Sequence, residues 1–480
     1  MRFCGSHAIR WWMLVALVLI VVAGVFITVH VLERRKEDDR AGGIVSSGLT
    51  ATPNAARTPT ILWTPTTTST PIPSTTPTST ATCTPTTIVS QPVRMLIYPY
   101  LGATTHNDVV ISWVTDGPAQ SEVRYSLDQS YANVVTATAS IHDGKHWHSA
   151  TISNLTAGTT YYYKVLSGGQ DLTAWPRITF TTAPESTASR FTFAVLGDSR
   201  PEDDDLPPSA GARAVAAQLR EHPFDFALHA GDIVYSGGIC SGQDSSWEQY
   251  IRAYFDLYRE SVGHVSFFPS VGNHEVTGGI CGYQGYTDVY HLPANAPAGD
   301  EEEYYSFDWG NAHFVALDSN QSCSPGSAQY SWLVNDLANS TQPWKFVFFH
   351  HPVYSSGSHG GSPSLRSHWV PLFEAHGVNI VFSGHDHHYE RTCPILEDAC
   401  STPRQGGVVY YVTGGAGAPL YRVGSDWFTA YSGSLHHFLL VEVSGCQLRV
   451  DAIDADGNVF DRYKIDRCGC DKDTTYKPWL

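Results

Sequence analysis

The sequence has few charged residues, few basic residues and few cysteines, and each shortage argues against a class of protein. Only 16% of the 480 residues are charged, which disfavours a coiled coil or a helical bundle. The 29 basic residues are outnumbered by 46 acidic ones, giving a formal net charge of −17, whereas binding to nucleic acid requires clustered Lys and Arg. Ten cysteines without a CxxC pair exclude a disulfide-scaffolded miniprotein and a zinc ribbon. The length instead predicts two or three folded units.

Long hydrophobic runs are also scarce, with one exception near the N-terminus. Residues 11–32 are apolar apart from His30 and are long enough to cross a bilayer, which takes about 20 residues. Basic residues lie on both sides of this run, so charge alone does not orient it. We predict a transmembrane anchor after a cytoplasmic segment at residues 1–10. A cleaved signal is the alternative, and a buried core helix is the least favoured interpretation.

Residues 33–90 predict a disordered stalk. Thr, Pro and Ser dominate residues 58–87, and such a composition cannot bury a hydrophobic core. Because stalks hold a domain away from a surface, the protein is expected to be extracytoplasmic. It would be anchored in the cell membrane, or secreted if the N-terminal segment is cleaved.

Residues 91–183 predict an all-β sandwich. Short runs rich in β-branched and aromatic residues alternate with Gly, Asp, Asn and Pro, for example at 109–115 and 159–167. Trp113 and the pair Tyr161 and Tyr163 are expected to lie in its core. The pattern resembles a fibronectin type III-like domain. Nothing in it has the spacing of a ligand set, so we interpret it as a scaffold.

Residues 190–466 predict an α/β layered domain, a mixed β-sandwich core flanked by helices, followed by a tail at 467–480. Apolar strands are expected at 191–197, 224–231, 265–273, 312–319, 344–351 and 377–385. Helices are expected between them at 209–221, 246–261, 326–338 and 365–376. The last three strands, 436–444, 446–454 and 458–466, have an antiparallel pattern, which makes the architecture mixed.

Polar side chains directly follow five of these buried strands. They occur in Gly197-Asp198, Gly231-Asp232, Gly272-Asn273, His350-His351 and the segment GHDH at 384–387. The carboxyl ends of strands are where ligand sites form in layered α/β proteins. Taken alone, such an Asp is more often a helix cap and such a His more often a structural residue. Five together provide enough donors for two metal ions that share one carboxylate.

The order GD…GDxxY…GNHE…VxxH…GHxH resembles the calcineurin-like metallophosphoesterase superfamily and, within it, the purple acid phosphatases. That family also carries a fibronectin-like domain ahead of the catalytic one. The segment GHDHHYER at 384–391 resembles the family's GHxHxYER most specifically. The wider superfamily begins with DxH, but here Asp198 is followed by Ser199 and Arg200. Tyr235 is placed to supply the missing ligand, and its phenolate oxygen favours a ferric ion; core packing is the alternative for Tyr235.

The resemblance implies a dinuclear centre of Fe(3+) and a divalent Fe, Zn or Mn ion. The implied ferric ligands are Asp198, Asp232, Tyr235 and His387. The implied ligands of the divalent ion are Asp232, Asn273, His350 and His385. His350 is preferred over His351 because it completes the VxxH motif, which leaves His351 a packing role or a supporting role beside the ligands.

Two further histidines match catalytic positions of the family. The resemblance implies that His274 assists the leaving group and that His359 binds substrate. His359 lies in the Ser/Gly-rich loop 355–364, where a flexible lid is expected. An exposed loop histidine without a function is the alternative for His359.

The implied activity is hydrolysis of phosphoric monoesters by a metal-bound hydroxide, that of an acid phosphatase of the purple type. One alternative keeps the metal site but acts on phosphodiesters such as nucleotides or lipid headgroups. A second is a catalytically silent cell-surface binding module. The acidic charge opposes a nucleic-acid-binding surface, and the oligomeric state stays open.

The cysteines are compatible with an oxidising compartment. Candidate disulfides join Cys240 to Cys281, Cys393 to Cys400, and Cys446 to either Cys468 or Cys470. The sequence alone does not decide the connectivity.

Overall fold

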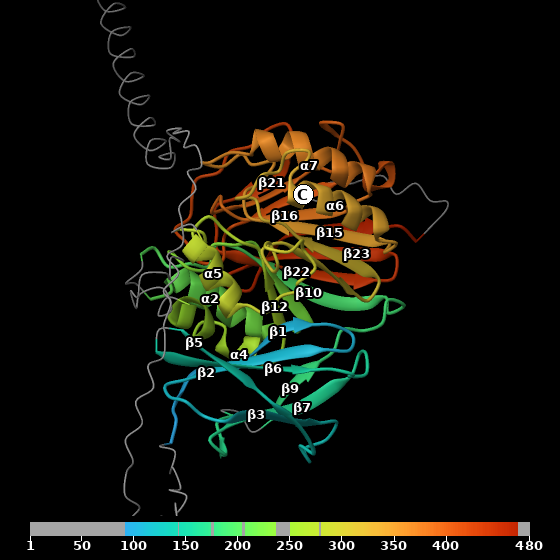
Figure 1. Cartoon of the computed structure of the whole chain (residues 1–480). Helices are drawn as coiled ribbons and strands as arrows, with labels where there is room; N and C mark the ends of the chain where they lie inside the picture. Colours follow the sequence, from blue (N-terminus) through green and yellow to red (C-terminus); the bar gives the residue numbers. More distant parts are fainter. Residues whose placement is uncertain are drawn as a thin grey trace, which may run out of the picture. The chain divides into compact units, whose positions relative to one another are not determined.

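The computed structural model describes residues 92–142, 144–173, 177–203, 207–236, 250–277 and 280–468, and Figure 1 shows the whole chain. The predicted anchor and stalk lie outside these residues, as do Cys240 and the side chain of Cys281. Across the described ranges, no helix is long and apolar enough to cross a membrane. The anchor therefore stays a prediction.

The first part of the described chain is a sandwich of two antiparallel sheets (blue to teal in Figure 1). One sheet has the strand order β1-β2-β6-β5, and the other has β4-β3-β7-β8 with β9 paired to β7. The strands are β1 (Met95–Thr104), β2 (Val109–Thr115), β3 (Ser121–Ser126), β4 (Asn133–Thr136), β5 (Thr138–His142), β6 (Lys145–Ile152), β7 (Thr160–Ser167), β8 (Gln170–Asp171) and β9 (Ile178–Thr181). Trp113 and Tyr163 are fully buried between the sheets, as predicted.

Hydroxyl groups fasten the sandwich to the α/β domain that follows it. The hydroxyl of Tyr100 donates to the carbonyl of Val289 at 2.8 Å, and that of Tyr163 donates to the carbonyl of Gly263 at 2.7 Å. Tyr100 also belongs to the same buried apolar cluster as Phe255. The sandwich thus packs against the α/β domain through buried groups, consistent with a scaffold.

The α/β domain contains two mixed sheets, which confirms the predicted layered architecture. The six-stranded sheet has the order β12-β11-β10-β22-β23-β24, with β10, β11 and β12 parallel. Its strands are β10 (Arg190–Leu196), β11 (Phe226–His229), β12 (Ser266–Pro269), β22 (His437–Ser444), β23 (Gln447–Asp454) and β24 (Val459–Asp466).

The seven-stranded sheet has the order β13-β14-β15-β16-β20-β17-β21. Its strands are β13 (Tyr305–Trp309), β14 (Ala312–Ala316), β15 (Trp344–Phe349), β16 (Ile380–Ser383), β17 (Tyr389–Thr392), β20 (Val409–Thr413) and β21 (Thr429–Gly433). Strands β14, β15, β16 and β20 run parallel. A small hairpin, β18 (Ile395–Leu396) with β19 (Ala399–Cys400), and a short 3₁₀ turn, η2 (Pro403–Gln405), lie between β17 and β20.

Three of the four predicted helices are present: α2 (Ala210–Glu221), α6 (Ala328–Asn339) and α7 (Pro363–Ala375). Each begins after a Ser whose hydroxyl accepts a backbone N–H of the first turn, the usual N-cap arrangement. The fourth prediction, 246–261, is only partly right, because its described part consists of a π-helical turn, η1 (Tyr250–Phe255), and a single turn, α4 (Arg259–Val262). Helix α5 (Ile280–Val289) was not predicted.

Aromatic side chains fill the space between the two large sheets. The ring centroid of Phe193 on β10 lies 5.2 Å from that of Phe314 on β14 and 5.2 Å from that of Phe346 on β15. Helices α6 and α7 lie on the other side of the seven-stranded sheet (Figure 1). There the ring centroids of Trp369 on α7 and Phe349 on β15 are 5.0 Å apart. Strands covered on both faces are largely apolar, and clusters of polar residues follow where several of them end.

Two of the candidate disulfides are formed. Cys393 is bonded to Cys400, and of the two alternatives for Cys446 the structure has Cys468. Cys323 is buried and free.

A buried histidine in this core predicts a pH-dependent stability. His313 on β14 contacts Asp308 at 2.6 Å and Asp336 at 2.8 Å. Burial opposes its charge, but the two carboxylates raise the pKa of His313 to about 9. The unfolded pKa is about 6.5, so this stabilisation is complete below pH 6.5 and is lost as the pH rises through 9. Denaturant unfolding at pH 6, 8 and 10 should show His313→Gln less stable than the wild type by at most about 3 kcal/mol at pH 6, with the gap closing by pH 10.

The difference between wild type and variant removes pH effects that the two proteins share. His222→Gln is a suitable control, because the ring of His222 faces a backbone carbonyl rather than carboxylates. A gap for His313→Gln that is constant across this pH range would contradict the prediction.

Candidate metal centre

The predicted ligands lie where strands of both sheets end at one edge. Asp198, Asp232 and Asn273 follow β10, β11 and β12 of the six-stranded sheet, whereas His350, His385 and His387 follow β15 and β16 of the seven-stranded sheet. The parallel direction of these strands brings their carboxyl ends together. Asp198, Asp232 and His385 have positive φ angles of 57°, 55° and 69°. Non-glycine residues in this left-handed region are uncommon and concentrate at functional sites.

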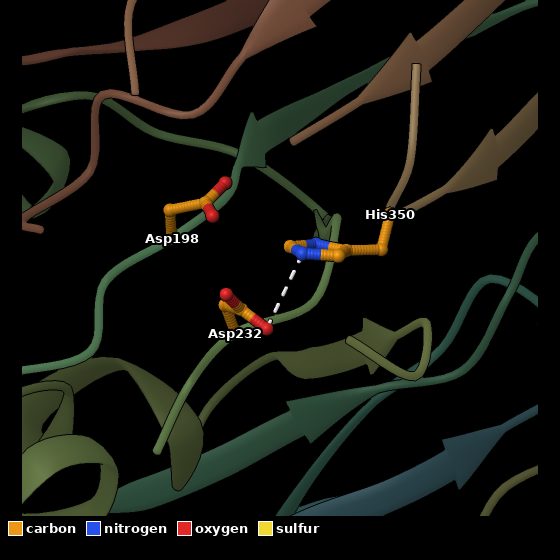
Figure 2. Close-up of side chains that lie close together, drawn as sticks. All are labelled: Asp198, Asp232 and His350. Carbon is orange, nitrogen blue, oxygen red and sulfur yellow. Dashed lines mark ion pairs between the residues drawn. The ribbon is translucent and has the colours of Figure 1, made fainter. Parts of the chain in front are cut away.

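Asp198, Asp232 and His350 converge on one point (Figure 2). Each of the three offers an atom within 4.8 Å of the other two, and Asp232 Oδ1 lies 3.3 Å from His350 Nε2. All three side chains are fully buried or nearly so. Asp198 Oδ2 accepts the backbone N–H of His385 at 2.8 Å. Asp198 Oδ1 is buried without a hydrogen-bond partner among the described residues, which fits a carboxylate oxygen that binds a cation.

Asn273 and His385 complete a second group of donor atoms around His350. Asn273 Oδ1 lies 2.9 Å from His350 Nε2 and 3.0 Å from His385 Nδ1, and the two ring nitrogens are 3.3 Å apart. Ligands bound at 2.0–2.2 Å around one tetrahedral ion lie roughly 3.4 Å from each other. The spacing of these three atoms therefore fits a shared divalent cation.

Hydrogen bonds on the far side of two imidazole rings leave their inner nitrogens free to coordinate. His350 Nδ1 donates to the carbonyl of Ala230 at 2.8 Å, and His387 Nδ1 donates to that of Pro419 at 2.7 Å. Nε2 of each ring is therefore the atom that a cation would bind in the neutral imidazole, and that of His387 lies 3.4 Å from Asp198 Oδ1. Backbone carbonyls that fix the tautomer in this way are a regular feature of metal-binding histidines.

Tyr235 and His274 lie together beside Asp232. Their ring centroids are 5.1 Å apart, and His274 Nε2 is 3.8 Å from Asp232 Oδ2. The backbone N–H of His274 donates to Asp232 Oδ1 at 3.0 Å, and His274 Nδ1 bonds to the carbonyl of Tyr235. The structure thus brings His274 to the carboxylate that was predicted to be shared and places the Tyr235 ring beside His274.

His351 and His359 lie beside the candidate ligands but are not themselves part of the set of facing ligand atoms. His351 Nδ1 bonds to Ser319 Oγ at 2.8 Å, consistent with the packing or supporting role expected for it. His359 is exposed, and its ring lies 4.5 Å from that of His385 and 5.3 Å from that of Tyr421. The loop of His359 was expected to be a flexible lid. In the structure two buried carboxylates, Asp386 and Glu390, accept hydrogen bonds from this loop, and its mobility stays a prediction.

The charges of Asp232, His350 and His385 depend on one another. Burial works against ionisation of Asp232, but His350 outweighs it and holds the pKa of Asp232 well below its usual range. Burial also opposes the charge of His350, whereas Asp232 and Asp198 raise the pKa of His350 to about 9. Burial and the neighbouring His350 lower the pKa of His385. Cation binding here would release the proton of His350.

Two residues that the sequence analysis did not select, Arg200 and Glu275, contact Asp232. Arg200 is buried, with Nε 3.5 Å from Asp232 Oδ2 and its guanidinium 5.2 Å from the centre of the Tyr235 ring. Glu275 is fully buried and accepts backbone N–H groups from four residues, listed here in chain order: Asp232, Ile233, Val234 and Gly272. A Cβ on Gly272 would overlap Asp232 and Glu275, so only glycine fits that position.

A further residue, Tyr421, comes from the chain between β20 and β21. Its ring stacks on that of His387, with centroids 4.1 Å apart and planes 15° apart. Its backbone N–H also donates to the carbonyl of His387 at 2.9 Å. No spacing or motif in the sequence links Tyr421 to the strand-end residues, so only the fold reveals this contact.

Comparison with known families gives two matches. Residues 191–389 match the calcineurin-like phosphoesterase family, and residues 96–182 match the N-terminal domain of purple acid phosphatases. The two matched regions correspond to the α/β domain and to the β-sandwich that precedes it.

Comparison with individual proteins also finds purple acid phosphatases among the similar sequences and structures. The chain is 28% identical over 337 residues to a purple acid phosphatase of Glycine max, covering 65% of this chain and 70% of that protein. It is 27% identical over 305 residues to an Fe(3+)-Zn(2+) purple acid phosphatase of Arabidopsis thaliana, covering 60% and 62%. The chain spans between 50% and 70% of the length of the first relatives that it matches. A purple acid phosphatase structure from yellow lupin seeds shares the fold, with a TM-score of 0.67 at 21% identity over 77% of this chain and 74% of that one.

Proposed function

Because the chain is a purple acid phosphatase-like member of the calcineurin-like metallophosphoesterases, and so a metal-dependent phosphoester hydrolase, we propose that it hydrolyses phosphoric monoesters. The reaction would use two metal ions that share Asp232. The supporting observation is the set of facing donor atoms of Asn273, His350 and His385, each within 3.3 Å of the next, beside the orphaned Asp198 Oδ1.

We assign the ligands as the sequence predicts. The ferric ion would be bound by Asp198, Asp232, Tyr235 and His387. The divalent ion, Fe, Zn or Mn, would be bound by Asp232, Asn273, His350 and His385. Such a pair supplies an acidified water as nucleophile and positive charge for the phosphoryl oxygens. Asp232 lies between both ligand sets, and its depressed pKa keeps it ionised.

His274 has a defined proton requirement in this proposal. Its Nδ1 is engaged by the carbonyl of Tyr235, and its Nε2 faces Asp232. Nε2 can therefore donate to a leaving oxygen only when the imidazole is protonated. Burial lowers the pKa of His274, so a proton donor at this position favours an acid pH optimum. His359, which reaches over His385 from an exposed loop, would bind the phosphoryl group.

We propose that the chain is exported and anchored in the cell membrane. The two disulfides agree with export to an oxidising compartment, and residues 11–32 would anchor the chain in a membrane. We also propose that the N-terminal sandwich is a fibronectin type III-like scaffold. An acidic chain of this kind is not expected to bind nucleic acid.

Hydrolysis of an aryl phosphate and of a bis-aryl phosphate, measured with metal analysis, tests the proposal. Faster hydrolysis of the monoester supports it, whereas faster hydrolysis of the diester supports a phosphodiesterase with the same ligands. A protein that binds two ions per chain and hydrolyses neither compound supports the silent binding module.

The visible spectrum tests the role of Tyr235. The purified chain should show a broad charge-transfer band with iron present, and Tyr235→Phe should abolish that band because the phenolate ligand is removed. Tyr354→Phe is the control, since the hydroxyl of Tyr354 bonds to Asp398 at 2.9 Å, away from the candidate ligands. A colourless protein with two manganese or zinc ions would reduce Tyr235 to a packing residue and move the expected pH optimum towards neutral.

A further inference from the structure

Asp386 stands between two candidate ligands but faces a different part of the chain. It is fully buried and lies between His385 and His387. Its Oδ1 accepts the backbone N–H of His359 at 2.9 Å, and its Oδ2 accepts the backbone N–H of Gly360 at 3.1 Å. The Ser355 hydroxyl also donates to Oδ2. Both carboxylate oxygens are therefore used by one loop, in contrast to Asp198, whose Oδ1 is orphaned.

The same loop is bound to its support at further points. Ser355 Oγ accepts the N–H of Gly357 at 3.0 Å, and a Cβ on Gly357 would overlap the His388 ring. Glu390 accepts the N–H and the hydroxyl of Ser356, both at 2.7 Å. Asp386, His388 and Glu390 all belong to the segment that carries His385 and His387, so this segment holds candidate ligands on one side and the loop on the other.

The anchoring determines where an exposed side chain can lie. A histidine in a segment rich in Gly and Ser would otherwise sample many backbone conformations. The bond between Asp386 and the N–H of His359 fixes the backbone at that residue. The imidazole is then held with its centroid 4.5 Å from that of His385, where it can reach an oxygen of a bound phosphoryl group.

We propose that Asp386 is a positioning residue that fixes the loop 355–360 and so places His359 to bind the phosphoryl group of the substrate. The anchoring stands on the hydrogen bonds alone, whereas the consequence for phosphate binding rests on the proposed function. Asp386 is not among the candidate ligands, and both of its carboxylate oxygens accept hydrogen bonds from the loop.

Amide hydrogen exchange tests the anchoring without any assay of activity. Asp386→Asn places an NH₂ group against donors of the loop, so peptides covering 355–360 should exchange at least roughly ten-fold faster than in the wild type. Ser355→Ala removes two of the loop's bonds, the one that its hydroxyl donates to Asp386 Oδ2 and the one that it accepts from the N–H of Gly357, and should act in the same direction. Asp454→Asn is the matched control, since Asp454 accepts backbone N–H groups from Asp456 and Asn458 in a turn between β23 and β24. Unchanged exchange at 355–360 in both loop variants would overturn the proposal.

A double-mutant cycle tests the route through His359. Inorganic phosphate is used as the inhibitor, and metal content is measured for each variant. Asp386→Asn should weaken phosphate inhibition roughly ten-fold with two ions per chain retained, and the same change in a His359→Ala background should have less than about a two-fold effect. Additive effects would overturn the role of His359, and if Asp386→Asn loses metal, Ser355→Ala takes its place in the cycle.

The two experiments separate this inference from the proposed function. A wild-type chain without phosphatase activity and without phosphate binding would defeat the proposed function and the consequence for His359. Hydrogen exchange would still decide whether Asp386 anchors the loop.

Discussion

Asp232→Asn should reduce kcat/KM for an aryl phosphate by at least ~1,000-fold and lower the metal content below two ions per chain. Asp232 occupies the centre of the site, with Oδ1 3.3 Å from His350 Nε2 and Oδ2 3.5 Å from Arg200 Nε. Asn has the same shape and keeps one acceptor for the N–H of His274, so the fold should survive. It removes the negative charge that two cations would share. Steady-state kinetics and elemental analysis of the purified variants give the answer.

The adjacent histidines provide the internal control for that experiment. His350 Nε2 lies among the donor atoms, so His350→Ala should lose the divalent ion. His351 is held by Ser319, so His351→Ala should keep both ions and most of the activity. If Asp232→Asn kept two ions and stayed within about ten-fold of the wild type, or if His351→Ala lost an ion that His350→Ala kept, the ligand assignment would be wrong.

The sequence predicts the strand-end residues well because two simple patterns coincide there. Strands buried on both faces are largely apolar runs, and a polar stretch follows each run where the strand ends. Asp198, Asp232, Asn273, His350 and His385 all follow such runs, and the structure brings them to one edge. The sequence does not show which strands belong to which of the two sheets that share this edge. One reason is that loops and a hairpin interrupt the strands between Tyr389 and Gly433.

The residues that surround the ligands could not be predicted, because their roles depend on distant parts of the chain. Tyr421 contacts His387 from a loop that has no ligand-like pattern. Arg200 stands where the wider superfamily has a histidine, but its position against Asp232 appears only in the folded chain. The loop of His359 has the composition of a flexible segment, and composition cannot show that Asp386 and Glu390 bind it.

Glu275→Ala should lower the free energy of unfolding by at least about 3 kcal/mol and weaken metal binding as well. Glu275 is fully buried and accepts four backbone N–H groups, three of them from the turn that carries Asp232. Each buried donor left without a partner costs about 1–3 kcal/mol, and the removed side chain leaves a cavity. The turn would then no longer hold Asp232 in its left-handed conformation, at a φ of 55°.

Denaturant unfolding of the metal-free protein separates the loss of stability from the loss of metal. Glu303→Ala is the matched control, because burial raises the pKa of Glu303 to about 7, the same value as for Glu275. Glu303, however, is only half-buried and bonds the side chain of Gln321 rather than a backbone turn. Its removal should cost less than about 1 kcal/mol. Equal losses of unfolding free energy for the two variants would contradict the prediction. They would show that burial of a carboxylate, rather than the four backbone hydrogen bonds of Glu275, determines the loss.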